Sequence, residues 1–171
     1  MPRCRVRPIR ALTFSLAALL IIQTSAAAQE SAPPPPASGS RYINPPGLTR
    51  PSGYTHVVVS SDGRTVYIAG QVAFDSAGQV VGLGDFRAQA AQVFSNLGRA
   101  LASVGATFGD VMKTTTYITD VRNLGMLRDA RGRYFDPARA PANTLIPVNT
   151  LARPELLLEI EAVAEIRPAP R

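Results

Sequence analysis

The chain has 171 residues, of which 46% are hydrophobic and 18% charged, and its formal net charge is +6. This length is typical of one domain, and the apolar content excludes a chain that is disordered throughout. One cysteine and one histidine exclude a disulfide framework and a Cys/His metal cluster within a single chain. The pI of about 10.2 suits a nucleic-acid or anionic-membrane partner if the positive charges lie in the folded part.

Residues 1–28 are typical of a secretory signal peptide. Arginines at positions 3, 5, 7 and 10 precede an apolar run over 11–22, and Ala26–Ala28 supply a small-residue cleavage site. This run of 12 residues is too short to span a bilayer, and an uncleaved anchor is the alternative. Cleavage after Ala28 would leave 143 residues and remove Cys4. It would also lower the net charge from +6 to +2, because 18 basic residues become 14 against 12 acidic ones.

The positive charge therefore belongs largely to the leader. We expect a periplasmic or secreted protein that binds no nucleic acid and has no membrane attachment after cleavage. Residues 29–41 include the tract SAPPPPASGS and predict a proline-rich disordered spacer, with a ligand for a proline-recognition domain as the alternative. The folded domain is expected over residues 42–171.

The first predicted elements of the domain are strands. Residues 55–61 and 65–69 are rich in β-branched and aromatic side chains, and Asp62-Gly63 between them indicates a hairpin. Residues 70–74 continue as an extended segment that ends in a turn around 76–78.

A helix is expected next, capped by Asp85, extending to about Val104 and stopped by Gly105. Its apolar stripe consists of Phe86, Ala90, Val93, Leu97, Ala100, Leu101 and Val104. A strand over 111–119, a weaker helix over 124–134, and strands over 143–150 and 156–164 complete the predicted elements.

The last strand alternates strictly between two faces. One face is wholly apolar, and the other carries three carboxylates, Glu159, Glu161 and Glu165. The element order β-β-α-β-α-β-β predicts an α+β fold in which both helices cover one side of a single sheet. The uncovered, partly polar side is then available for self-association or a ligand.

Few residue types are available for catalysis in the cleaved chain. Without cysteine, the options are carboxylates, hydroxyls, Tyr, Arg and the single His56. A lone strand histidine such as His56 is more typical of a packed or surface residue than of a catalyst. Gly82 and Gly84 precede the long helix and favour a plain turn over an anion site. Glu159 and Glu161 point to the same face, either as a solvated sheet surface or as a pair with one raised pKa.

Several segments together resemble the RidA/YjgF family of small reactive-imine deaminases. They are YIAGQV over 67–72, Gln89-Ala90 and Asn96-Leu97, GATFGDVMKTT over 105–115, YITD over 117–120, Pro141-Ala142, and LLEIEAVA over 157–164. The similarity covers about residues 42–166, nearly the whole cleaved chain.

This resemblance implies a chorismate-mutase-like single mixed sheet with two helices packed on one face. It also implies a homotrimer with small-molecule clefts between subunits and chemistry that needs no metal or cofactor. In deaminating members a glutamate on the last strand positions the attacking water, and Glu159 matches it. Tyr54 matches a cleft tyrosine, and Gly70 lies on the strand that lines the cleft.

The chain departs from the family at the arginine that grips a substrate carboxylate, where it has Asn143. An amide cannot form the bidentate ion pair of a guanidinium, so the binding free energy of a substrate carboxylate is weaker by about 1.5–3 kcal/mol. Arg122, where an asparagine is common, is a candidate displaced cation or a plain surface residue.

These matches and departures lead to the functional expectation. We expect a RidA-like hydrolase or deaminase acting on imine- or enamine-type substrates, of the 2-iminobutanoate/2-iminopropanoate deaminase kind with altered preference. A non-catalytic ligand-binding or chaperone-like protein is the alternative. RNA cleavage suits the charge of +2 poorly.

Overall fold

The structure is a computed structural model, and it describes residues 39–166. Six strands form one mixed sheet in the order β1-β2-β3-β6-β4-β5. Neighbouring strands pair antiparallel, except β4 and β5, which pair parallel. The strands are β1 (Arg41–Ile43), β2 (Val57–Val59), β3 (Thr65–Gln71), β4 (Val111–Ile118), β5 (Ala142–Pro147) and β6 (Leu158–Glu165).

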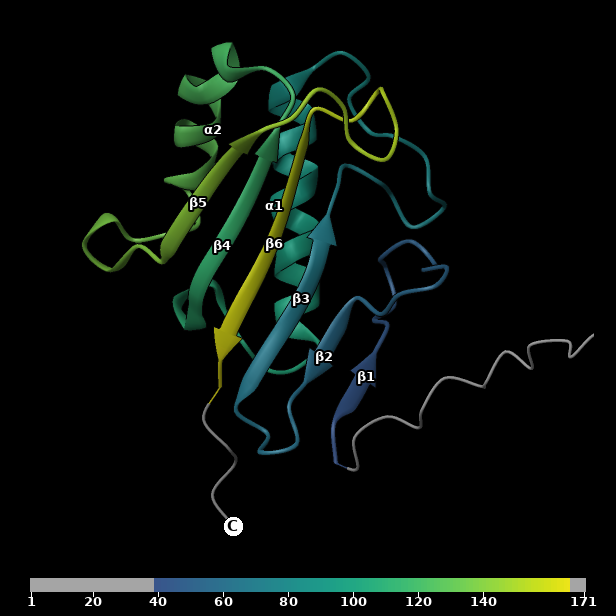
Figure 1. Cartoon of the computed structure of the whole chain (residues 1–171), viewed down its shortest axis with the longest axis vertical. Helices are drawn as coiled ribbons and strands as arrows, with labels where there is room; N and C mark the ends of the chain where they lie inside the picture. Colours follow the sequence, from purple (N-terminus) through teal and green to yellow (C-terminus); the bar gives the residue numbers. More distant parts are fainter. Residues whose placement is uncertain (1–38, 167–171) are drawn as a thin grey trace, which may run out of the picture. The chain divides into compact units, whose positions relative to one another are not determined.

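Two helices, α1 (Phe86–Ala102) and α2 (Leu124–Arg131), lie on the same side of this sheet (Figure 1). Helix α1 packs against β3, β6 and α2. Helix α2 belongs to the crossover that returns the chain from β4 to the parallel strand β5, the connection that parallel strands require. The expected α+β fold, with a single mixed sheet and both helices on one face, is therefore confirmed.

The ends of α2, β5 and β2 differ from those predicted from the sequence, and a local feature of the chain accounts for each difference. The second helix ends at Arg131 instead of residue 134, because Gly132 forms its C-cap. Strand β5 ends at Pro147, which has no amide proton to continue the ladder. Strand β2 is shorter than the expected 55–61, because the amide of His56 bonds to the Asn44 side chain.

Strand β1 was not predicted, since it is only three residues long and starts at Arg41, the last residue assigned to the spacer. The expected leader with Cys4, and spacer residues 29–38, lie outside the described residues. Within residues 39–166 no helix has the length and apolar character needed to cross a membrane.

Helix α1 begins where its sequence predicts and ends at Ala102, slightly before the predicted end at about Val104. The Asp85 carboxylate accepts hydrogen bonds from the amides of Arg87 (2.9 Å) and Ala88 (3.1 Å). Gly105 follows the helix with a φ of +75°, a conformation that favours glycine. Since Asp85 already occupies the first-turn amides, the glycines before it form a turn and not an anion site, as the sequence favoured.

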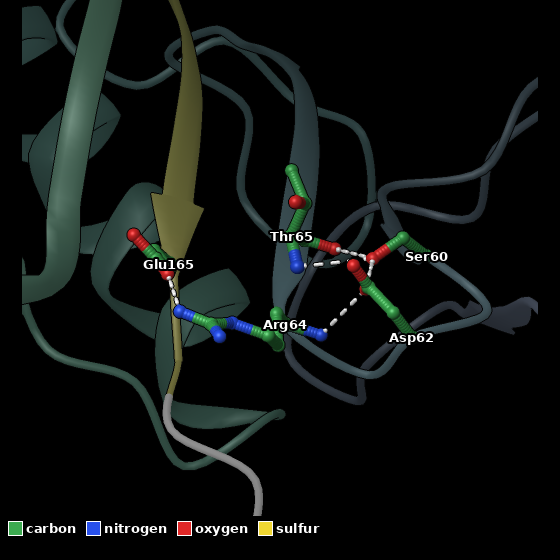
Figure 2. A network of polar contacts seen from close by, with 5 residues as sticks. All are labelled: Ser60, Asp62, Arg64, Thr65 and Glu165. Atoms are coloured by element: carbon green, nitrogen blue, oxygen red, sulfur yellow. Dashed lines mark hydrogen bonds and ion pairs between the residues drawn. The ribbon is translucent and has the colours of Figure 1, made fainter.

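The β2–β3 hairpin is closed by a small polar network (Figure 2). The Ser60 hydroxyl donates to the carbonyl of Thr65 and accepts from its amide, both at 3.0 Å. The Asp62 carboxylate accepts from the amide of Arg64 at 2.9 Å, and the Arg64 guanidinium pairs with Glu165 on β6. Of the three carboxylates on β6, the exposed Glu165 thus forms an ion pair with the hairpin residue Arg64.

The apolar face of β6 forms the centre of the core. Leu158, Ile160, Ala162 and Ala164 are buried, while the residues between them are half-buried or exposed on the uncovered side. The buried stripe of α1, with Val93, Phe94 and Leu97 at its middle, packs against this face. The alternation predicted from the sequence is confirmed.

A β-bulge interrupts this alternation in β3. Ile68 pairs with Ala162 and Gln71 with Ile160, so two residues of β3, Ala69 and Gly70, oppose one residue of β6. The extra residue places both Ala69 and Gly70 on the uncovered side and returns Gln71 to the buried side. Gly70 thereby faces the same side of the sheet as Glu159.

Candidate functional site

Gly70 and Glu159 lie against each other on the uncovered side of the sheet. A Cβ atom built on Gly70 would overlap the Glu159 Oε1 atom and lie 2.7 Å from its Cδ, closer than real Cβ contacts come. The lack of a side chain at Gly70 therefore makes the space that the Glu159 carboxylate occupies. Sequence reasoning placed both residues in the cleft, and the structure brings them together.

Glu159 is half-buried, and burial is the main reason that its pKa is raised above the ordinary value. The negative charge of Glu161, two positions along β6 on the same face, raises the pKa further. A carboxylate with a raised pKa accepts a proton more readily than a solvated one, which is the property a general base requires. Of the two alternatives open from the sequence, this arrangement favours the pair with one raised pKa.

Tyr54 lies beside this carboxylate. Partial burial, followed by the negative charge of Glu159, raises the pKa of its phenol, so the hydroxyl keeps its proton at neutral pH. About half of the Tyr54 side chain is exposed, and its ring meets the His56 ring edge-on at 5.2 Å between centroids. The phenol is therefore a hydrogen-bond donor at the open edge of the site.

His56 is buried and bonded on both ring nitrogens. Its Nε2 lies 2.8 Å from the carbonyl of Thr49, which can only accept, so Nε2 carries a proton. Its Nδ1 lies 3.3 Å from the Gln71 Nε2 and is the acceptor in that bond. These partners hold the ring in place and give His56 a structural role. Of the packed and surface positions that the sequence left open for His56, the structure shows the packed one.

Gln71 and His56 together support the bulge. The Gln71 side chain donates to the carbonyl of Ala69 (2.8 Å) as well as to His56. The carbonyl of the bulge residue Ala69 is thus hydrogen-bonded to a buried side-chain amide. This arrangement fixes the backbone that carries Gly70.

Two buried amides of α1 fix the segments on either side of the site. Asn96 donates to the carbonyls of Val72 (3.0 Å) and Phe74 (2.8 Å), just after β3. Gln89 donates to the carbonyl of Glu155 (2.8 Å) and accepts from the amide of Leu157 (2.9 Å), just before β6. Both residues were part of the family resemblance, but their role as anchors was not predicted.

Asn143 lies apart from Glu159 within one chain. In the sheet register Asn143 pairs with Thr114, and Thr114 with the buried Ala162, so Asn143 lies on the helix-covered side. Its Oδ1 accepts hydrogen bonds from the hydroxyls of Thr114 (2.9 Å) and Thr116 (3.1 Å). Glu159 lies two strands away and on the opposite side of the sheet.

Arg122, the candidate displaced cation, is held by a neighbour instead. Its Nε lies 3.0 and 2.9 Å from the two oxygens of Asp120, and its Nη2 lies 2.6 Å from Asp120 Oδ2. The Arg122 side chain is 88% exposed. These contacts are typical of a surface ion pair, and they partly neutralise the cation.

The uncovered side of the sheet also contains a hollow of about 320 Å³. Glu161 and Lys113 line it together with Tyr67, which is about half exposed, and Thr115. Such a mixture of one acid, one base and an exposed aromatic ring suits either a polar ligand or a second protein surface.

Within residues 39–166 no group of three or more His, Cys, Asp or Glu side chains is arranged to hold a metal ion. The groups gathered around Glu159 are a carboxylate, a phenol and backbone. They can move protons and position water.

The chain is a small α+β protein with one mixed sheet and two helices on one side of it. On the other side, the Glu159 carboxylate lies against Gly70. Residues 48–166 match the family model described as endoribonuclease L-PSP. The chain belongs to this family, which is the RidA/YjgF family that its motifs resemble.

Curated relatives of the chain include a RutC family protein and a deaminase. A RutC family protein of Synechocystis is 34% identical over 115 residues, which is 67% of this chain and 87% of the relative. The 2-iminobutanoate/2-iminopropanoate deaminase of Mus musculus is 38% identical over 102 residues, which is 59% of this chain and 73% of that enzyme.

Solved structures with the same fold include two members of the Rid family. YyfB from Yersinia pestis matches with a TM-score of 0.58 and 41% identity, over 75% of this chain and 99% of that one. RidA from an Antarctic Psychrobacter species matches with a TM-score of 0.66 and 27% identity, over 73% of this chain and 98% of that one.

Proposed function

We propose that the protein hydrolyses small imines, with Glu159 as the residue that positions and activates the attacking water. The observation that carries this proposal is the half-buried Glu159 carboxylate, with its raised pKa, in the space left by Gly70. Similarity to deaminases named for 2-iminobutanoate and 2-iminopropanoate supports imines as the substrate class.

The reaction requires one general base close to the imine carbon. Glu159 removes a proton from water as the water oxygen bonds to that carbon, and the proton passes to the imine nitrogen. The proton of the new hydroxyl then moves to the nitrogen and the C–N bond breaks, so that one imine and one water give one carbonyl compound and one ammonia. The Tyr54 phenol, which stays protonated beside Glu159, donates a hydrogen bond to the developing oxygen or nitrogen.

We further propose that the site is completed by a second copy of the chain in a homotrimer. Glu159, Gly70 and Tyr54 cluster on the uncovered side of one chain, whereas Asn143 lies on the covered side of edge strand β5. All four residues can contact one ligand only if Asn143 comes from a neighbouring subunit. Static light scattering of the purified protein tests this, since a monomer mass would contradict it.

Asn143 favours a substrate that is held less tightly through a carboxylate than in the deaminases. Its Oδ1 is already bonded to two threonine hydroxyls, which leaves the amide NH2 as the group available to a ligand. This observation also supports the second candidate function, a protein that binds a small ligand in the same cleft without turning it over.

The deciding experiment measures imine lifetimes. Imines are generated from several amino acids by an amino-acid oxidase, and their decay is followed with the wild-type protein, with Glu159→Gln and with buffer alone. Hydrolysis predicts faster decay with wild type and decay at the buffer rate with Glu159→Gln. Equal decay in all three samples would contradict hydrolysis of these imines and leave the binding function.

Glu161→Gln is the matched control, because it removes a carboxylate from the same face of the same strand. It should retain the faster decay if Glu159 is the reacting group. An equal loss in both variants would assign the effect to surface charge.

We propose export to the periplasm or the medium as the location of this activity. The leader-like residues 1–28 support it. N-terminal sequencing of the protein recovered after expression in a bacterial host tests it, with Gln29 as the expected first residue.

A further inference from the structure

The hollow of about 320 Å³ on the uncovered side of the sheet is lined by one acidic and one basic side chain, Glu161 and Lys113. Tyr67 on β3, Val163 on β6 and Lys113 on β4 lie opposite one another in a row across these three neighbouring strands. Glu161 lies two residues before Val163 on β6, so both side chains are on the same face of the sheet. The two charged residues therefore line one hollow from neighbouring strands.

Neither charge has a partner in the part of the chain that the structure describes. The ion pairs found there join arginines to acidic residues, and none includes Lys113 or Glu161. Glu161 and Lys113 occupy diagonal positions, for which Cβ atoms are about 7–8 Å apart, so a small molecule has room between the two charged groups. Glu165, the other diagonal neighbour of Lys113, already pairs with Arg64.

This combination selects a ligand with two opposite charges. Lys113 would attract a simple carboxylate while Glu161 repelled it, and the reverse holds for a simple amine. A ligand that has an ammonium and a carboxylate close together can form charge-assisted hydrogen bonds with both residues at once. The Thr115 hydroxyl adds a further hydrogen-bonding group to the same hollow.

The remaining wall of the hollow is mainly apolar. Tyr67, which is 53% exposed, lines it together with Val58, Ala69 and Val163. An exposed aromatic ring beside branched side chains offers apolar contact to the side chain of a ligand. The volume is at the lower end of the range of about 300–1,000 Å³ for small-molecule sites, which suits a single amino acid.

We propose that this hollow binds a free α-amino acid with an apolar side chain, as its zwitterion. The ligand carboxylate pairs with the Lys113 ammonium, the ligand ammonium pairs with the Glu161 carboxylate, and the ligand side chain contacts Tyr67. Because both ion pairs are partly open to solvent, we expect a dissociation constant on the order of 1 mM. The lining includes neither Glu159 nor Asn143, so the site does not depend on the proposed hydrolysis.

The test observes binding at Lys113, which is the only lysine of the chain. The full chain is produced with isotope-labelled lysine, and the single set of lysine side-chain signals is followed by NMR during titration with L-leucine. We expect saturable shifts with leucine. Affinity should be at least about fivefold weaker for N-acetyl-L-leucine, which lacks the ammonium, and for L-leucinamide, which lacks the carboxylate. Lack of saturation up to about 20 mM leucine, or equal affinity for either capped compound, would overturn the proposal.

Glycine tests the apolar wall, because it has both charges and no side chain. It should bind at least about threefold more weakly than leucine. Equal affinity for the two amino acids would contradict the contact with Tyr67.

Variants assign the binding to the hollow. Glu161→Gln should weaken leucine at least about fivefold, whereas Glu165→Gln, which removes the other carboxylate diagonal to Lys113, should change it less than about twofold. Unchanged affinity in Glu161→Gln would contradict the proposal. Glu159→Gln should bind leucine within about twofold of wild type. A loss as large as that of Glu161→Gln would place leucine in the proposed catalytic cleft and overturn the assignment.

A second copy of the chain is the competing occupant of this hollow. The Lys113 signals are therefore also recorded without ligand over a series of protein concentrations. Constant signals are expected. Signals that move on dilution would identify the hollow as an interface between copies and overturn the amino-acid site.

Discussion

The Glu159 carboxylate occupies the position that a Gly70 side chain would fill. Gly70 does not have a φ in the left-handed region, so the glycine is required by space and not by backbone conformation. The position of the Glu159 carboxylate on β6 therefore depends on the lack of a side chain at position 70 of the neighbouring strand β3.

Gly70→Ala should displace the Glu159 carboxylate while the fold remains, because the overlapping atoms belong to the end of a flexible side chain. Misplacement of a reacting group by about 1 Å costs about 100-fold in rate, and we expect a loss of that size in kcat/KM on imines. Steady-state kinetics and circular dichroism check the two parts. An alanine variant with full activity would show that the close contact is not needed for catalysis.

Glu159→Gln should raise the melting temperature at neutral pH while removing the imine hydrolysis. The folded pKa of Glu159 is raised, so the native state binds its proton more tightly than the unfolded state does. The resulting stabilisation is present at low pH and is lost as the pH rises through the folded pKa. We expect a gain of about 1–3 °C at pH 8 that shrinks toward pH 4.5. Melting curves over this range measure it, and a lower melting temperature at pH 8 would contradict it.

Glu161→Gln should lower the pKa of Glu159, because the Glu161 charge is the second cause of its elevation. The basic form of Glu159 then persists to lower pH. The acidic limb of the kcat/KM profile is expected to move to lower pH, with little change on its plateau. A limb that does not move would mean that another group limits the reaction.

Asn143→Arg should increase hydrolysis of imines that carry a carboxylate, and leave imines without one unchanged. The guanidinium supplies the bidentate ion pair that an amide cannot form, so we expect kcat/KM for these imines to rise about 10- to 100-fold. The same change removes the acceptor of two threonine hydroxyls and adds a cation near Arg131, so the melting temperature should fall. Equal rates on both kinds of imine would contradict the role assigned to this position.

Gln71→Met should destabilise the β3 bulge. It leaves the Ala69 carbonyl and His56 Nδ1 without the donor that now serves both. Buried groups left unsatisfied cost about 1–3 kcal/mol of unfolding free energy. Urea unfolding measures this cost, and Gln92→Met, a half-buried amide elsewhere on the helix side, is the comparison.

Sequence reasoning recovered most of the fold because its signals are local. The alternation in β6, the Asp85 cap and the Asp62-Gly63 turn each depend on residues close together in the chain. The bulge was not predicted, since an extra residue in a strand is defined by pairing with a distant partner, here β6.

The site was only partly predictable for the same reason. The resemblance led to Glu159, Gly70 and Tyr54, which the structure brings together. The anchoring bonds of Gln71 to His56 were not predicted, because a single glutamine in a strand carries no local signal. The hollow lined by Lys113 and Glu161 was likewise missed, since it depends on how the distant strands β3, β6 and β4 lie side by side.

The bulge in β3 places two residues, Ala69 and Gly70, opposite one residue of β6. Deleting Ala69 would leave a single residue there, so regular alternation would keep Gly70 on the uncovered side and Gln71 on the buried side. The carbonyl to which the Gln71 side chain now donates would be lost, and the close approach of the Gly70 backbone to the Glu159 carboxylate would change. The length of β3 at this one position thus sets where the glycine lies relative to the carboxylate, even with every named site residue still encoded.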